Sequence, residues 1–151
     1  MFSLFKRRPF FNFREEQNIM QAIRDAEQRT SGEIRLFIES RCRYVDPLER
    51  AGEIFYHLKM NETALRNGVL VYMAYKDRQL AIFGDEGIHQ KTGTEFWKTE
   101  VKKLLSYFNK NNYQDGFITI ITEIGEALCT HFPYNANTDK NELPDEIVFG
   151  K

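Results

Sequence analysis

Polar residues around three glycine-containing turns are the part of this sequence best suited to chemistry. The turns lie at residues 30–33, 66–68 and 84–87. Their ionisable and amide side chains are Glu33, Arg66, Asn67, Asp85 and Glu86, with His89 just beyond. Grouped carboxylates of this kind could hold a divalent cation that bridges them to a phosphate. The alternative is three ordinary turns, in which Arg66 forms an ion pair with one carboxylate.

Motifs of the well-marked enzyme classes are absent from the sequence. There is no phosphate-binding glycine loop, no zinc-binding His-Glu-x-x-His, no cysteine phosphatase loop and no Gly-x-Ser-x-Gly nucleophile turn. A calcium-loop spacing occurs near the C-terminus at Asn135, Asn137, Asp139, Asn141 and Glu146. Lys140 takes the glycine position of such a loop and Pro144 interrupts it, which favours a polar tail. Motifs therefore leave the catalytic and metal-binding residues unknown.

The hydrophobic pattern predicts how the three turns are brought together. Residues 69–75 form an unbroken apolar run, which is typical of a strand buried on both faces. Residues 79–83 predict a returning antiparallel strand. Residues 33–40 alternate apolar and polar side chains, which indicates a strand near a sheet edge with one wetter face. We expect 69–75 to lie between the other two strands, with all three turns at one sheet edge.

Helices should cover both faces of this sheet. Apolar residues at steps of three and four predict helices over 15–30, 47–59, 94–109 and 117–132, and residues 88–93 predict a turn or a short helical piece. Asp46 and Pro47 are a strong helix start. A strand–helix–strand connection implies that 33–40 and 69–75 run parallel. The expected fold is a three-layer α/β/α sandwich with about four helices and a small mixed sheet of three or four strands.

Composition limits the function classes. The 151 residues suit one domain, and a formal net charge of −1 gives no general attraction to nucleic acid. Two cysteines and no long apolar run predict a cytoplasmic protein without a membrane span. We expect a flexible arm at 1–12, a single domain at 13–133 and a tail at 134–151 that packs on or near it. A final stretch at 146–149 could pair with a sheet edge.

The turn residues also resemble a known family. Thr-Ser-Gly-Glu-Ile at 30–34, Arg-Asn-Gly-Val-Leu at 66–70, Asp-Arg at 77–78 and Gly-Asp-Glu-Gly-Ile at 84–88 are similar in order and spacing to the TPM domain. The ending at 141–150 resembles the short bacterial members without a membrane anchor. The resemblance implies an α/β/α sandwich. It also implies a choice of functions, because relatives are described as a calcium-binding acid phosphatase, as photosystem repair factors or as membrane-protein modulators.

Two departures from the secreted members of that family bear on cation binding. Arg66 stands where those members often carry an acidic residue, and residues 11–14 replace an Asp-containing segment. Both changes remove ligands that the resemblance would imply for calcium or magnesium. We therefore expect weak or no binding of either ion.

Two hypotheses follow for the function. The first is a non-catalytic interaction or assembly-support module with a protein partner, which could be membrane-associated. The second is a weak phosphomonoester hydrolase that depends on a divalent cation held by Glu33, Asp85 and Glu86. Turnover of an aryl phosphate, with and without metal, separates them.

Overall fold

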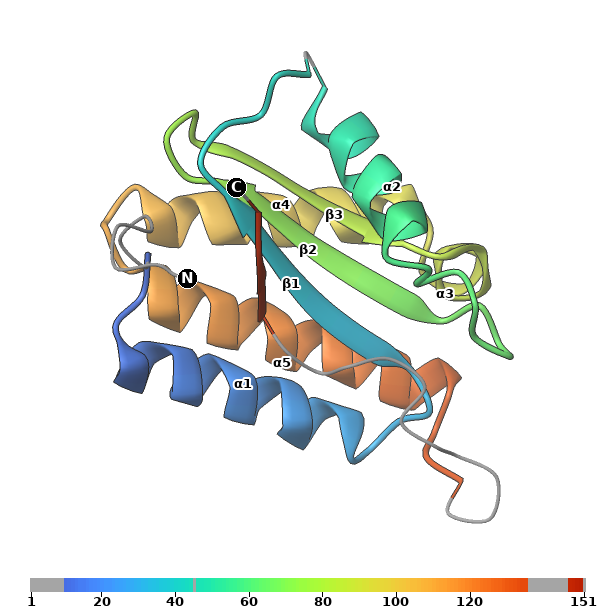
Figure 1. The fold of residues 1–151 in the computed structure, drawn as a ribbon. Helices are drawn as coiled ribbons and strands as arrows, with labels where there is room; N and C mark the ends of the chain where they lie inside the picture. The colour runs from blue at the N-terminus through green and yellow to red at the C-terminus, as the bar shows by residue number, and fades with distance from the viewer. Residues whose placement is uncertain (1–9, 45, 136–146, 151) are drawn as a thin grey trace, which may run out of the picture.

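The computed structural model describes residues 10–44, 46–135 and 147–150. Within these ranges the chain forms five helices and four strands. In chain order they are α1 (Phe13–Glu27), β1 (Glu33–Glu39), α2 (Pro47–His57), β2 (Gly68–Ala74), β3 (Gln79–Gly84), α3 (Glu86–Thr92), α4 (Thr94–Phe108), α5 (Tyr113–His131) and β4 (Ile147–Phe149). Figure 1 shows the arrangement.

The four strands form one mixed sheet in the order β3-β2-β1-β4. β1 and β2 are parallel, with Glu33 opposite Gly68, while β2 and β3 are antiparallel, with Val69 opposite Gly84. The predicted central position of β2 is confirmed. β4 pairs parallel to β1 through Leu36 and Ile147. The starts of β1 and β2 and the end of β3 consequently lie at one edge of the sheet.

Helices cover the two faces of the sheet unequally. Figure 1 shows α2 alone on one face and α1, α4 and α5 on the other, which confirms the α/β/α sandwich. The larger core lies beneath the three helices, and the smaller core lies beneath α2. The region around 117–132 is helical although its β-branched residues favour strands, because helical spacing buries one continuous apolar face of α5.

The ends of α1 differ from the expected range of 15–30. Asn12 caps the helix: its side chain accepts a hydrogen bond from the Glu15 N–H at 2.8 Å, and the Glu15 carboxylate accepts one from the Asn12 N–H at 3.0 Å. The helix ends at Glu27, and Thr30 lies outside it, where it forms a bridge with Pro133. The start of α2 is confirmed, since the Asp46 carboxylate accepts a hydrogen bond from the Leu48 N–H at 2.9 Å.

The prediction that one face of β1 is exposed to solvent is wrong. Glu33, Arg35 and Glu39 alternate with apolar residues as predicted, yet all three are buried. The alternation correctly separates the two faces of the strand. The polar face is buried because Arg50 of α2 binds the Glu39 carboxylate and because Val148 of β4 packs beside Phe37.

The end of the expected flexible arm packs on the domain. Phe11 is only 2% exposed and belongs to the larger core. Its ring contacts Phe117 at a centroid distance of 5.8 Å, and Phe10 contacts Tyr75 and Tyr113 at 5.0 Å each. Residues 10–12 are therefore part of the folded domain. The remainder of the arm and almost all of the calcium-like spacing in the tail lie outside the described residues.

Candidate functional site

An ion-paired cluster occupies the sheet edge where the sequence predicted a site. Both oxygens of the buried Asp85 carboxylate accept hydrogen bonds from Arg66, at 2.7 Å from Nε and 2.8 Å from Nη2. Arg66 Nη1 also lies 2.6 Å from a Glu86 oxygen. The hydrogen bond with Asp85, followed by the attraction of both carboxylates, raises the pKa of Arg66. The expected neutralisation of a carboxylate by Arg66 is confirmed.

Glu33 and Asn67 lie at the same edge but take part in backbone pairing. The Glu33 N–H donates to the Asn67 carbonyl at 3.3 Å, and the Asn67 side-chain amide donates to the Ser31 hydroxyl at 3.3 Å. The fold thus brings all five predicted residues to one edge. No cluster of three or more histidine, cysteine, aspartate or glutamate side chains that could hold a metal ion occurs in the described ranges.

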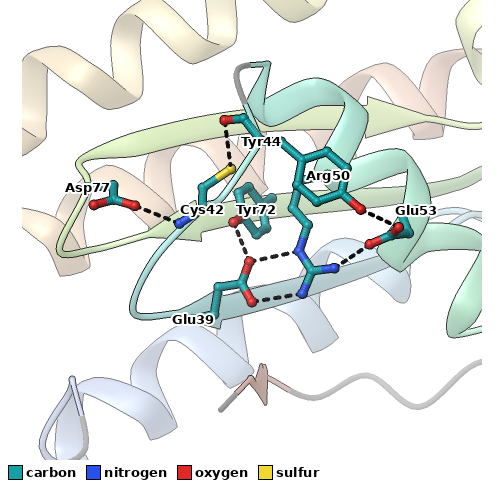
Figure 2. Close-up of polar contacts among 7 residues, drawn as sticks. All are labelled: Glu39, Cys42, Tyr44, Arg50, Glu53, Tyr72 and Asp77. Carbon is teal, nitrogen blue, oxygen red and sulfur yellow. Dashed lines mark hydrogen bonds and ion pairs between the residues drawn. The ribbon is translucent and has the colours of Figure 1, made fainter.

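A second polar cluster lies at the opposite ends of β1 and β2. Arg50 of α2 donates two hydrogen bonds of 2.9 Å to the Glu39 carboxylate, which also accepts one from the Tyr72 hydroxyl (Figure 2). Arg50 binds Glu53 as well, and Glu53 accepts from the Tyr44 hydroxyl. Burial, followed by the hydrogen bond to Glu39, raises the pKa of Tyr72. Glu39 is thus a buried carboxylate with its charge matched by one arginine.

The loop after β1 is anchored to this region. The Asp77 carboxylate accepts a hydrogen bond from the Cys42 N–H at 2.8 Å and pairs with Arg41 at 2.9 Å. The Cys42 thiol lies 3.7 Å from the Tyr44 carbonyl (Figure 2). These contacts hold the loop that leads into α2 and so help to position Arg50.

An acidic pair, in which Glu100 is buried and Glu123 is partly exposed, joins α4 to α5. Burial, followed by a hydrogen bond with Glu123, raises the pKa of Glu100 to about 7. Partial burial alone would raise the pKa of Glu123, but hydrogen bonds with Lys103 and Glu100 lower it. Lys103 Nζ lies 2.8 Å from Glu123 and 3.7 Å from Glu100. Glu100 therefore keeps its proton to a higher pH than Glu123 does.

An apolar groove of about 410 Å³ runs along β3, on the side of the strand that is not paired with β2. Its floor is the length of β3 from Leu80 to Gly84. One wall is the start of α2, with Leu48, and the other is α4, with Trp97 and Val101. Leu48 is 47% exposed, which is high for a leucine on a helix that covers a sheet. The groove combines apolar walls with a strand at the border of the sheet.

Comparison with known proteins agrees with the resemblance in the turns. The family model described as the TPM domain matches residues 6–127, which is most of the chain. The chain belongs to the TPM domain family. The solution structure of the BA42 protein from Bizionia argentinensis is 39% identical, with a TM-score of 0.86, and the match covers 96% of this chain and 99% of that one.

A more distant TPM-like fold is found in another bacterium. The N-terminal domain of the cg2496 protein from Corynebacterium glutamicum is 13% identical, with a TM-score of 0.60, and the match covers 92% of this chain and 80% of that one. At this identity the likeness concerns the fold alone. No curated protein matches the chain in sequence. In the described part of this TPM domain no helix is long and apolar enough to cross a membrane.

Sequence reasoning missed the Arg50 cluster and the groove of this TPM domain. Arg50 and Glu53 are three residues apart on a helix, and Glu39 ends a strand of a parallel pair, where α/β proteins often place ligands. Those signals could have indicated the cluster. The groove left a weaker signal, because its floor and its two walls come from three elements that are separate in the sequence.

Proposed function

We propose that this TPM domain is a non-catalytic interaction module that binds an extended polypeptide segment in the groove along β3. The groove is the observation that carries the proposal. It is open, its walls are mostly apolar, and its volume of about 410 Å³ suits several side chains of a bound segment. Aliphatic and aromatic side chains at such a surface contribute binding energy when a partner removes them from water.

The charged clusters favour a binding role for the protein over a catalytic role. Asp85 has both carboxylate oxygens bound to Arg66, and Oδ1 also accepts the Glu86 N–H at 2.8 Å. Arg50 is bound to Glu39 and Glu53 in the same way. A nucleophile or a general base in either cluster would first have to lose these partners.

A selection from a peptide library tests the proposal. Random eight-residue peptides displayed on phage are selected against the protein, and the affinity of the resulting synthetic peptides is measured by fluorescence anisotropy. Leu48→Asp should weaken their binding about tenfold or more, because burial of a leucine side chain contributes about 1.5–3 kcal/mol. Aspartate at the second position of α2 suits the helix dipole, so the variant should stay folded.

Leu65→Asp is the matched control. Leu65 is 52% exposed, close to the exposure of Leu48, and it does not line the groove. Selected peptides should bind this variant with unchanged affinity. Equal losses in the two variants, or no loss in either, would show that the groove is not the binding surface.

The hydrolase hypothesis requires that a divalent cation binds at the Arg66 cluster. A cation at the Arg66 cluster would have to displace the Arg66 guanidinium from Asp85. Aryl phosphate turnover is therefore measured with magnesium, with calcium and with a chelator. Metal-dependent turnover that disappears in Asp85→Asn would support a hydrolase and would contradict the proposed function.

A further inference from the structure

The backbone of β3 offers hydrogen-bonding groups to the groove. Bonded and non-bonded residue pairs alternate along an antiparallel ladder. The Asp85 N–H donates to the Gly68 carbonyl at 2.9 Å, so this pair is bonded and the next one, at Gly84, is not. The alternation turns the N–H and C=O groups of Leu80 and Ile82 away from β2. β3 is the last strand of the sheet on this side (Figure 1), so these groups face the groove that Leu80 and Ile82 line.

The two walls of the groove differ in chemistry. On the α2 side, Leu48 presents an exposed apolar side chain, and the nearby Asp46 carboxylate already caps the helix. On the α4 side, Lys98 and Lys102 are exposed and four residues apart, which places them in one row. Lys98 has a loose contact of 3.7 Å with Glu95. A strand in the groove would send alternate side chains toward these two walls.

We infer that the occupant of the groove adds to β3 as a further strand, with apolar side chains toward Leu48 and acidic side chains toward Lys98 and Lys102. The inference rests on the proposed function and specifies its partner as an extended segment in which apolar and acidic residues alternate. Main-chain hydrogen bonds to Leu80 and Ile82 supply affinity, and the two walls supply specificity. The lysine row also selects against basic segments by repulsion.

Three capped synthetic peptides of equal length test the inference. They alternate valine with glutamate, glutamine or lysine, and their binding is measured by fluorescence anisotropy at low and high salt. Two exposed ion pairs predict that the glutamate peptide binds about three- to tenfold more tightly than the glutamine peptide, and that salt removes the difference. An N-methylated glutamate peptide, which cannot complete the ladder, should bind at least tenfold more weakly.

A charge reversal supplies the decisive variant. In Lys98→Glu/Lys102→Glu the preference should change to the lysine peptide. The control is Lys91→Glu/Lys110→Glu, which changes the net charge equally at exposed positions outside the groove and should keep the preference for glutamate.

The outcomes separate this inference from the proposed function. If all three peptides bind equally and Leu48→Asp weakens them all, the charge assignment is wrong and the groove remains a binding site. Undiminished binding of the N-methylated peptide overturns strand addition. If no peptide binds, or if Leu48→Asp weakens none, both proposals fail. A dimer in sedimentation velocity that Leu48→Asp dissociates would assign the groove to a second copy of the chain and overturn the peptide as occupant.

Discussion

Replacing Arg50 with methionine should destabilise the protein by about 3 kcal/mol. The side chain of Glu39 is only 7% exposed, and Arg50 supplies two of its hydrogen bonds and its counter-charge. Removal of one partner of a buried ion pair costs about 3–5 kcal/mol, because the other charge stays buried without compensation. Because Arg50 is partly exposed, water can reach the Glu39 carboxylate in the variant, and the Tyr72 hydroxyl still binds that carboxylate. The expected cost is therefore at the lower end of this range, about 3 kcal/mol.

The measurement is urea unfolding at pH 7, followed by circular dichroism and checked by a thermal melt. A loss of about 3 kcal/mol corresponds to a fall in Tm of about 6–12 °C for a domain of this size. Methionine keeps an unbranched chain of similar reach, so the packing of α2 should change little. Glu39→Gln alone should cost about 1 kcal/mol, since a neutral amide can still accept hydrogen bonds.

The double variant Arg50→Met/Glu39→Gln identifies the cause. Once the buried charge is removed, the combined cost should be about 2 kcal/mol, well below the sum of the single changes. Arg41→Met is the control for loss of an arginine, because its pair with Asp77 is exposed and should contribute less than about 1 kcal/mol. The reasoning is refuted if Arg50→Met costs no more than Arg41→Met, or if the costs in the double variant simply add.

Three further predictions concern other parts of the domain. Because the pKa of Glu100 is raised in the fold, its contribution to stability is present at low pH and is lost as the pH rises through about 7. Glu100→Gln should therefore stabilise the protein more at pH 8 than at pH 5 in urea unfolding, and an equal effect at the two pH values would contradict this prediction. Phe11→Ala should cost about 3–5 kcal/mol in the same assay, while Phe13→Ala, at a site 78% exposed, should change stability by less than about 0.5 kcal/mol. Calorimetry should detect weak or no calcium binding by the native protein and tighter binding by Arg66→Asp, whose Tm should rise with added calcium; tight binding by the native form or no gain in the variant would contradict this prediction.

Local patterns in the sequence were sufficient for most of the elements. The seven apolar residues at 69–75 required cover on both faces, and the structure places β2 between β1 and β3. Asp46 and Pro47 marked the start of α2 because capping involves groups within one helical turn. The three turns also meet where predicted, since strand direction alone determines which ends share a sheet edge.

The surroundings of the polar side chains could not be predicted in this way. The alternation in β1 assigned Glu39 to the correct face, but whether that face is wet depends on α2 and β4. Likewise, nothing in the residues beside Phe11 indicates a core position, because its neighbour Phe117 lies in α5.

The sequence by itself determined the fold class, the order of the first three strands and the edge that collects Arg66 and Asp85. Each depends on hydrophobic period, chain direction or turn chemistry, which are properties of short segments. Only the tertiary structure decided that Glu39 is buried against Arg50 and that Leu48 faces the row of lysines across β3. Burial and grooves depend on which distant elements cover a surface, so they arise only when the whole chain is packed.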